Sequence, residues 1–356
     1  AQQLRNLSFE RERTMDEEKK EGLKRNTSVR DVLEHSYGNS YDVNRFFVAL
    51  ARGAGFDASI LYVSARNRRT FNKLLLWLGQ VNDEAAQVKV NGKEVILDPG
   101  TKYCPYGLLR WKNTSATAFR LAKNGDAFIT TPAPQSSVTH RVARMSLAAD
   151  GSAKGEITVE WMGEDSLERR IEALKTDEAG RRKSLEDELM AWLPNGATAK
   201  LQSAEGWEEA EKRLVARFAV EVPSFAAVTG KRILAPAYFF SPFQKSMFLP
   251  EFRQYPIVFS YPFAEQDEFM IKLPDGYSVE AAPYHRKAGL AYGGYEIGSS
   301  MQDNQLTVQR TLRLDRMRFQ SDEYLELKGF FAIVQAGDGE QAVLQSAATS
   351  GAKKEQ

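Results

Sequence analysis

Residues 37–56 have the sequence YGNSYDVNRFFVALARGAGF, and this stretch decides the first part of the fold. Its apolar side chains recur at helical spacing, at Val43, Phe46, Phe47, Leu50 and Ala54. The pattern predicts a helix that follows Ser40, buries this face and stops at Gly55. Ser40 then lies at or beside the helix N-terminus. There it acts either as an ordinary N-cap or, in the positive end of the helix dipole, as a nucleophile.

The neighbouring segments predict a short helix and three strands. Ser28 and Asp31 have the spacing of a capping box, which predicts a helix ending near Gly38. Residues 58–64 have the composition of a strand. Two further strands, 84–90 and 94–97, flank Asn91-Gly92, a strong signal for a tight hairpin. We therefore expect helices packed on an antiparallel sheet.

A run of small and turn-forming residues, TTPAPQSS at 130–137, predicts a boundary between two domains. Beyond it, many short strand-like runs alternate with a few helical ones, which indicates a mostly antiparallel sandwich-type domain with helical insertions. The predicted class is α+β. The predicted division is a charged N-terminal arm at 1–27, a core at 28–131, a β-rich domain at 138–345 and a flexible tail at 346–356.

The composition limits the chemistry. With 356 residues, 42% hydrophobic and 27% charged, the chain has the composition of a soluble globular protein of about two domains. A net charge of +1 gives no field that would recruit nucleic acid, and no apolar run is long enough to span a membrane. The single cysteine, Cys104, excludes internal disulfides, and we interpret it as a buried thiol. The three histidines lie far apart in the sequence, at His35, His140 and His285. Their spacing does not match a metal site, so no metal or cofactor is predicted.

Three spaced motifs carry a resemblance to a known family: Gly38-Asn39-Ser40, Val81-Asn82-Asp83 and Leu97-Asp98-Pro99-Gly100. Residues 28–111 resemble the core of the transglutaminase-like superfamily, the papain-type fold of bacterial and archaeal proteins. In that family Gly-x-Cys opens the central helix, Asn-His begins the next long strand, and Asp-Pro ends the strand after it. The segment KLPDGY at 272–277 resembles the β-rich region that follows such cores. The resemblance implies an exported protein, periplasmic or secreted, with a further β domain ahead of this chain.

The departures from the family pattern argue against catalysis. Ser40 stands at the cysteine position and Asp83 at the histidine position, so only Asp98 matches. A serine hydroxyl is a weaker nucleophile than a thiolate, and a carboxylate with a pKa near 4 is a poor base for it. Asp83 and Asp98 would also repel, which raises one pKa or draws in a cation or water.

The resemblance and its departures together predict a catalytically inactive module that is structural or that binds a peptide, a protein or a glycan. The side chains expected to line its cleft are Tyr37, Asn39, Tyr41, Asn82, Tyr103, Tyr106 and Trp111.

Two other interpretations stay open. A peptidase or amidase could pair Ser40 with Lys73, as in Ser-Lys enzymes, or with a recruited histidine such as His35. Strand length favours Asp83 over Lys73 at the motif position, because a start at Lys73 leaves ten further residues to loop out before the hairpin. A carboxylate metal site from Asp42, Asp83 and Asp98 is the third interpretation, although the spacing does not match a calcium loop.

Overall fold

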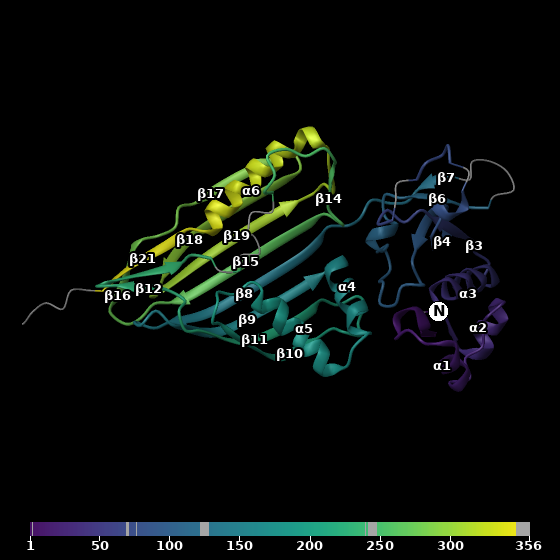
Figure 1. Cartoon of the computed structure of the whole chain (residues 1–356), viewed down its shortest axis with the longest axis horizontal. Helices are drawn as coiled ribbons and strands as arrows, with labels where there is room; N and C mark the ends of the chain where they lie inside the picture. Colours follow the sequence, from purple (N-terminus) through teal and green to yellow (C-terminus); the bar gives the residue numbers. More distant parts are fainter. Residues whose placement is uncertain are drawn as a thin grey trace, which may run out of the picture. The chain divides into compact units, whose positions relative to one another are not determined.

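The computed structural model describes residues 1, 3–68, 71–75, 77–121, 128–238, 240 and 248–346. The chain forms two compact units (Figure 1). Most of the predicted flexible tail, residues 347–356, lies outside the described residues. The first unit comprises Ala1–Ser136, Met162–Asp177 and Gly206–Arg213, and the second comprises Ser137–Trp161, Glu178–Glu205 and Leu214–Gln356.

The first unit is a five-stranded antiparallel sheet with helices, in the strand order β5-β4-β3-β6-β7. Its strands are β3 (Asp57–Val63), β4 (Asp83–Val90), β5 (Lys93–Leu97), β6 (Thr117–Phe119) and β7 (Phe128–Thr130). Its helices are α1 (Met15–Lys20), α2 (Val29–His35), α3 (Ser40–Gly53) and α4 (Glu164–Ala173), with the short 3-10 helices η1 (Leu7–Phe9), η2 (Leu78–Gln80) and η3 (Trp111–Asn113). A separate two-stranded parallel ladder joins β1 (Arg5–Asn6) to β2 (Tyr37–Gly38).

Two local sequence signals in this unit are confirmed by the structure, the capping box of α2 and the hairpin turn between β4 and β5. The side chains of Ser28 and Asp31 form the expected capping box of α2, although the helix already ends at His35. Asn91 and Gly92 both adopt positive φ, 49° and 80°, as a two-residue hairpin turn between β4 and β5 requires.

Helix α3 differs from the prediction at both its cap and its buried face. Asn39, not Ser40, is the N-cap, and it forms a capping box with Asp42. Ser40 is the first helical residue. Val43 and Phe46 are buried as expected, but Leu50 is 50% exposed because the face turned toward the sheet runs through Asn44 and Val48 instead.

The sheet of the first unit has two covered faces. On one face Val48 of α3 packs in a cluster with Ala86 and Val88 of β4. On the other face the cluster contains Leu61, Val63, Ala85, Leu109, Ala116 and Ala118. Because successive side chains of a strand point to opposite faces, even-numbered residues of β4 face α3 and odd-numbered residues face away from it.

Helix α4 belongs to the first unit although it lies beyond the predicted boundary. Its Leu167 and Ile171 complete a cluster with Phe9, Cys104 and Leu108. The first unit thus also includes 162–177 and 206–213, which lie within the predicted β-rich domain at 138–345. The apolar partners of α4 come from distant parts of the sequence, which no local pattern reveals.

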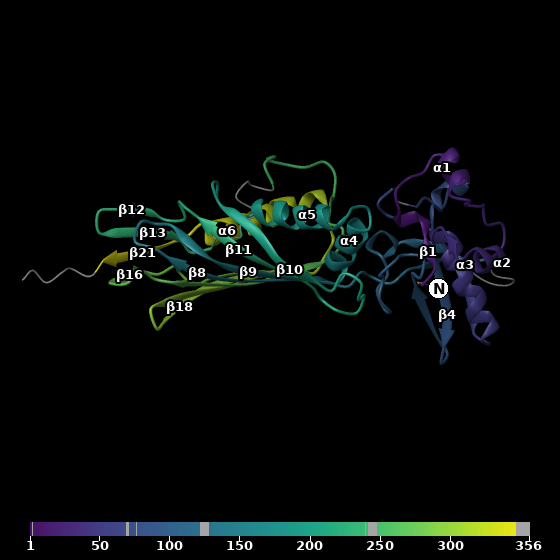
Figure 2. The same ribbon diagram turned by 90° about the horizontal axis from the view of Figure 1, so that it is seen from below.

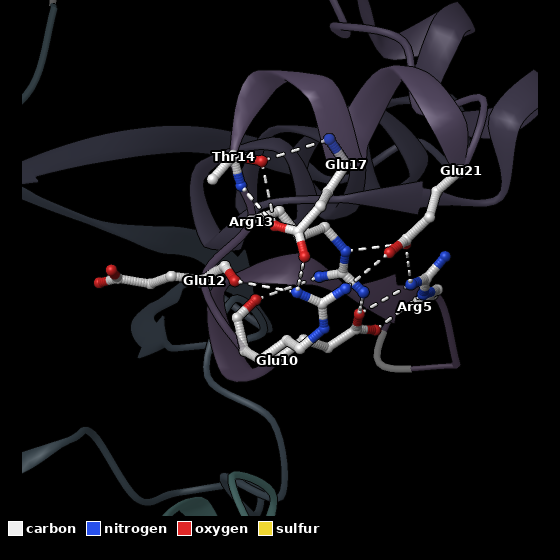
Figure 3. A network of polar contacts seen from close by, with 8 residues as sticks. Arg5, Glu10, Glu12, Arg13, Thr14, Glu17 and Glu21 are labelled. Carbon is white, nitrogen blue, oxygen red and sulfur yellow. Dashed lines mark hydrogen bonds and ion pairs between the residues drawn. The ribbon is translucent and has the colours of Figure 1, made fainter.

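The predicted charged arm folds back on itself. Helix α1 is exposed, and the side chains of Thr14 and Glu17 form its capping box. Arginines and glutamates of the arm alternate in one ion-pair network (Figure 3), formed by Arg5, Glu10, Arg11, Arg13, Glu17 and Glu21. A network of this kind stabilises more than isolated surface pairs do, because each charge has several partners.

The second unit is built on an eight-stranded sheet in the order β10-β11-β9-β8-β15-β19-β18-β17 (Figures 1 and 2). In this sheet β8 (Ser137–Leu147) and β15 (Phe263–Lys272) are parallel, whereas the pairs β10-β11, β11-β9, β15-β19, β19-β18 and β18-β17 are antiparallel. The remaining strands are β9 (Ala153–Met162), β10 (Thr198–Glu205), β11 (Leu214–Val222), β17 (Arg286–Leu290), β18 (Gly293–Gln302) and β19 (Gln305–Leu314).

Smaller elements complete the second unit. A four-stranded sheet has the order β12-β13-β21-β16, and β14 pairs with β20. These elements, with the two helices, are β12 (Ala227–Thr229), β13 (Arg232–Pro236), β14 (Ile257–Val258), β16 (Tyr277–Ala281), β20 (Arg318–Phe319), β21 (Gln341–Ser346), α5 (Glu178–Met190), α6 (Tyr324–Asp338) and the 3-10 helix η4 (Ser321–Glu323). The predicted α+β class with mostly antiparallel sheets is confirmed. Within the described residues, no helix is long and apolar enough to cross a bilayer.

A buried ionic row crosses the large sheet under α6. Arg141 of β8 and Arg310 of β19 flank Asp267 of β15 in the same register, and both ion-pair with it, at 2.6 and 2.9 Å. Arg310 also binds Asp338 at the C-terminal end of α6 at 2.8 Å. All four side chains are buried. Because a buried charge is tolerated only with such partners, the row fixes α6 to this face of the sheet.

Candidate functional site

Asn44 holds the N-terminal half of α3 against the third motif and against Glu84, the residue that follows the second motif. Its Nδ2 donates to the carbonyl of Glu84 at 2.9 Å, and its Oδ1 accepts from the N–H of Gly100 at 2.7 Å. Gly100 is packed so closely that an added Cβ would clash with the carbonyl oxygen of Ser40. The Asp-Pro-Gly motif therefore lies directly against the backbone of the first turn of α3.

Ser40 contacts the N-terminal segment of the chain through its backbone. Its backbone N–H donates to Oγ of Ser8 at 2.9 Å. Its own Oγ has no hydrogen-bond partner among the residues described here. A backbone N–H at this position is the kind of donor that would stabilise an oxyanion in acyl transfer. Here the N-terminal segment of the same chain occupies it.

Asp83 opens β4 and faces away from α3. It is paired in register with Val63, and it shares its face of the sheet with Ala85, whereas the next residue, Glu84, turns toward α3 and binds Arg45 at 2.6 Å. The carboxylate of Asp83 binds Nζ of Lys112 at 2.5 Å. Among the described residues, no hydrogen bond joins the carboxylate of Asp83 to the hydroxyl of Ser40.

Asp98 directly follows β5 and is 6% exposed. The hydroxyl of Thr101 donates to its Oδ2 at 2.9 Å. Burial and then the negative charge of Asp83 raise the pKa of Asp98 to about 6. The repulsion expected from two carboxylates is therefore present at Asp98, and Lys112 is the cation beside Asp83.

Lys73 and His35, the two candidate bases for a serine enzyme, have partners other than Ser40. Nζ of Lys73 lies 5.8 Å from the ring centroid of Phe128 in β7, at the opposite end of the sheet from β5. Nδ1 of His35 lies 2.7 Å from Oδ1 of Asn26, and its ring is stacked on Tyr37. Neither side chain hydrogen-bonds to Ser40 in the described part of the chain.

Asp42, the third member of the hypothetical metal site, is used in the structure of α3. Its Oδ2 accepts from the N–H of Asn39 at 3.1 Å and from Nδ2 of Asn26 at 3.3 Å. The described residues contain no group of three or more His, Cys, Asp or Glu side chains placed to hold a metal ion.

The residues predicted to line one cleft do not lie together. Four of them line two separate hollows, and three line neither. The first hollow, of about 490 Å³, lies between the arm and the start of α3 and includes Tyr37, Asn39 and Tyr41. It is polar and carries both signs of charge, from Glu18, Lys24, Arg25, Asp42 and Arg45.

The second hollow has a volume of about 560 Å³ and contains Asp98. We call it the acidic hollow; its lining is Ala1, Gln3, Phe47, Leu97, Asp98, Pro99, Cys104, Pro105, Tyr106, Ala210 and Glu211. Of the predicted cleft residues only Tyr106 lines it. The sequence analysis did not identify Glu211, which belongs to the first unit through the segment 206–213.

Three predicted cleft residues line neither hollow. Oδ1 of Asn82 accepts from the N–H of Ala65 at 2.9 Å, so this amide holds a loop in place. The guanidinium of Arg66 lies over the ring of Trp111, 5.1 Å from its centroid. Tyr103 packs against the cluster of Phe9 and Cys104. These three side chains thus have contacts within the first unit.

Two more titratable groups lie near Asp98. Glu164 at the start of α4 is 1% exposed, and burial raises its pKa to about 8. Burial also raises the pKa of the Cys104 thiol, which donates to the carbonyl of Leu108. A buried thiol with a raised pKa is unreactive. Glu164 lies far from Asp98 in the sequence, so no motif spacing signals it.

Comparisons with known proteins add a family for part of the second unit. Residues 230–344 match DUF3858, a domain of unknown function with a solved structure. No curated protein matches the chain. One similar solved structure is a protein of Parabacteroides distasonis ATCC 8503 described as a "putative protease". It is 11% identical with a TM-score of 0.48, and the match covers 90% of this chain and 46% of that one. The chain therefore spans less than half the length of this protein.

Proposed function

We propose that the first unit is a transglutaminase-like, papain-type core that has lost acyl-transfer chemistry and acts as a structural or binding module. The order of its elements supports this: the helix α3, the strand β3, the hairpin of β4 and β5, and then Asp98-Pro99. The position of Gly100 against the carbonyl of Ser40 supports it further, because the first and third motifs then meet at the N-terminus of α3.

The environment of Ser40 carries the proposal of inactivity. A serine nucleophile needs a base in hydrogen-bond reach and donors for the oxyanion. The N–H of Ser40 is bound to Ser8, and Asp83 is turned toward Lys112. The contacts of Lys73 with Phe128 and of His35 with Asn26 argue against the peptidase or amidase alternative.

The hollows support the binding part of the proposal. Each has the volume of a small-ligand site and contains charged and aromatic side chains. The ligand class that we propose is an extended peptide, a protein segment or a glycan. The compartment that we propose, from the family resemblance, is the periplasm or the exterior; fractionation of the native cells tests it.

Labelling with a fluorophosphonate probe tests the proposal of inactivity. We expect the folded protein and the variant Ser40→Ala to be equally unlabelled. The variant Ser8→Ala, which frees the N–H of Ser40, should also stay unlabelled because it supplies no base. Stoichiometric labelling that disappears in Ser40→Ala and after unfolding would overturn the proposal.

A further inference from the structure

The connection between β3 and β4 presents three large apolar side chains to solvent. Leu74 is 93% exposed, and Leu75 and Trp77 are each 49% exposed. The loop that carries them is held in shape by Gln80, whose side chain is buried. Its Nε2 donates to the carbonyls of Asn72 and Leu75 at 3.1 and 2.7 Å, and its Oε1 accepts from the N–H of Asn72 at 2.8 Å. The three side chains therefore project from a hydrogen-bonded loop.

The base of this loop is anchored to the hairpin of β6 and β7. The ring centroids of Phe71 and Phe128 lie 5.6 Å apart, and so do those of Phe128 and Phe119, which are partners in register. Leu121, two residues after Phe119, is exposed as well. We call the exposed apolar side chains of this region the leucine tip; they are Leu74, Leu75, Trp77, Leu121 and Phe128. Exposed apolar patches of this kind mark sites of interaction with proteins or membranes.

The loop that carries the leucine tip is basic. Residues 65–82 contain four arginine or lysine residues and no aspartate or glutamate, although the whole chain has 48 basic and 47 acidic residues. Nζ of Lys73 lies 5.8 Å from the ring centroid of Phe128. Neither Arg68 nor Lys73 forms an ion pair with any acidic side chain that the structure describes. The leucine tip thus lies beside positive charges that these acidic side chains do not offset.

A bilayer with anionic headgroups fits this combination best. In such a surface, leucine side chains enter the apolar boundary, tryptophan prefers the interface, and lysine and arginine are attracted to the anionic headgroups. A protein partner fits less well, because a standard protein–protein interface takes about 20–30 residues from each side. The leucine tip has five exposed apolar side chains.

We propose that the leucine tip docks the protein on a bilayer that carries anionic lipids. The side chains of Leu74, Leu75 and Trp77 enter the boundary between headgroups and acyl chains. Lys73 and Arg68 contact the anionic headgroups. Because only a few side chains insert, the attachment is reversible. Docking through these side chains requires no acyl-transfer chemistry, so it is independent of the function proposed above.

Co-sedimentation with large unilamellar vesicles at about 0.1 M ionic strength tests the proposal. The full chain should bind mixed vesicles of phosphatidylcholine and phosphatidylglycerol, and it should bind vesicles of phosphatidylcholine alone at least about fivefold more weakly. Leu74→Ser with Leu75→Ser should weaken binding to the mixed vesicles at least about tenfold. The control is Leu33→Ser with Leu50→Ser, at two leucines of α2 and α3 that are 62% and 50% exposed. This control should bind as the wild type does.

A charge variant tests the part played by the basic side chains. Arg68→Gln with Lys73→Gln should reduce the preference for the mixed vesicles to about twofold or less, because the charges that attract the headgroups are gone. An unchanged preference in this folded variant would contradict docking through these two residues.

The fluorescence of Trp77 reports on insertion directly. Phosphatidylcholine brominated on its acyl chains, added to the mixed vesicles, should quench part of the tryptophan fluorescence of the wild type. In Trp77→Phe this quenching should disappear, whereas binding should stay within about threefold because phenylalanine is also apolar. This readout decides the outcome even if the double leucine variant fails to fold, which thermal unfolding of each variant shows.

Three results would overturn the inference. They are absence of binding to the mixed vesicles by the folded wild type, equal binding by folded Leu74→Ser with Leu75→Ser, and equal quenching in Trp77→Phe. The first of them would leave a protein as the partner of the leucine tip. All three leave the labelling result at Ser40 unaffected, so failure of docking is distinguishable from failure of the proposed inactivity.

Discussion

Nζ of Lys112 lies 2.5 Å from Oδ2 of Asp83, so a residue of η3 neutralises the carboxylate at the start of β4. Both side chains are largely buried. Lys112→Met should cost about 1–3 kcal/mol at pH 7, because it leaves Asp83 uncompensated beside Asp98. The urea midpoint measures this. The double variant Asp83→Asn, Lys112→Met should recover most of the loss, and an absence of recovery would show that Lys112 contributes through packing alone.

Glu164→Gln should stabilise the protein in a pH-dependent manner. The pKa of Glu164 is raised to about 8, whereas the unfolded chain ionises near 4.5. Unfolding therefore becomes easier as the pH rises from about 4.5 to 8, because only the unfolded state loses the proton. The variant should match the wild type at pH 4.5 and exceed it by about 3–5 kcal/mol at pH 8.

Urea unfolding at pH 4.5, 6 and 8 measures this difference. The control is Glu172→Gln in the same helix, an exposed residue paired with Lys175, which should shift the free energy by no more than about 0.5 kcal/mol at each pH. Parallel pH curves for the wild type and Glu164→Gln would contradict a buried neutral carboxyl.

Stability should be sensitive to the buried side of α3 and indifferent to its exposed side. Phe46→Ala should cost about 3–5 kcal/mol, and Leu50→Ala about 0.5 kcal/mol or less. At the N-terminus, Asn39→Ala should cost about 1 kcal/mol as the loss of a cap, and Ser40→Ala much less. Chemical denaturation of the four variants measures these values. A larger cost for Ser40→Ala than for Asn39→Ala would contradict the cap assignment.

Installing the family's thiol and imidazole should not restore a reactive pair. The match of the sequence motifs to the family pattern predicts that Ser40→Cys with Asp83→His brings the thiol and the imidazole into contact. Since residue 83 faces Val63 and Lys112, we expect iodoacetamide to alkylate the double variant no faster at pH 7 than Ser40→Cys alone. Cys104, buried and with a raised pKa, adds little background. Faster alkylation of the double variant would show that residue 83 does lie within reach of residue 40, as the motif match predicts.

Features set by neighbouring residues could be predicted from the sequence. The capping box of Ser28 and Asp31 and the Asn91-Gly92 turn depend on contacts within four residues. The cap of α3 could also have been found, because Asn39 and Asp42 have capping-box spacing. The exposure of Leu50 could not be predicted, because the orientation of α3 depends on the hydrogen bonds of Asn44 to Glu84 and Gly100. These two residues are more than 35 positions away in the sequence.

The candidate site was predictable only where its residues belong to the three sequence motifs. Asp98 follows from the Asp-Pro motif, and the mutual effect of two carboxylates follows from electrostatics alone. Glu164 and Glu211 enter from α4 and from 206–213. The position of Glu164 depends on the packing of Leu167 and Ile171 against Phe9, and such long-range apolar contacts have no local sequence signature.

Helix α4 also sets the order in which the first unit can be completed during synthesis. A ribosome that has translated residues 1–136 has produced every strand of the five-stranded sheet, yet Phe9, Cys104 and Leu108 still lack Leu167 and Ile171. The unit becomes whole only after residue 213 has emerged, when several strands of the second unit have been made as well. The nascent chain therefore holds an exposed apolar surface while residues 137–161 are made, and such a surface is a natural target for a chaperone that binds the unfinished protein.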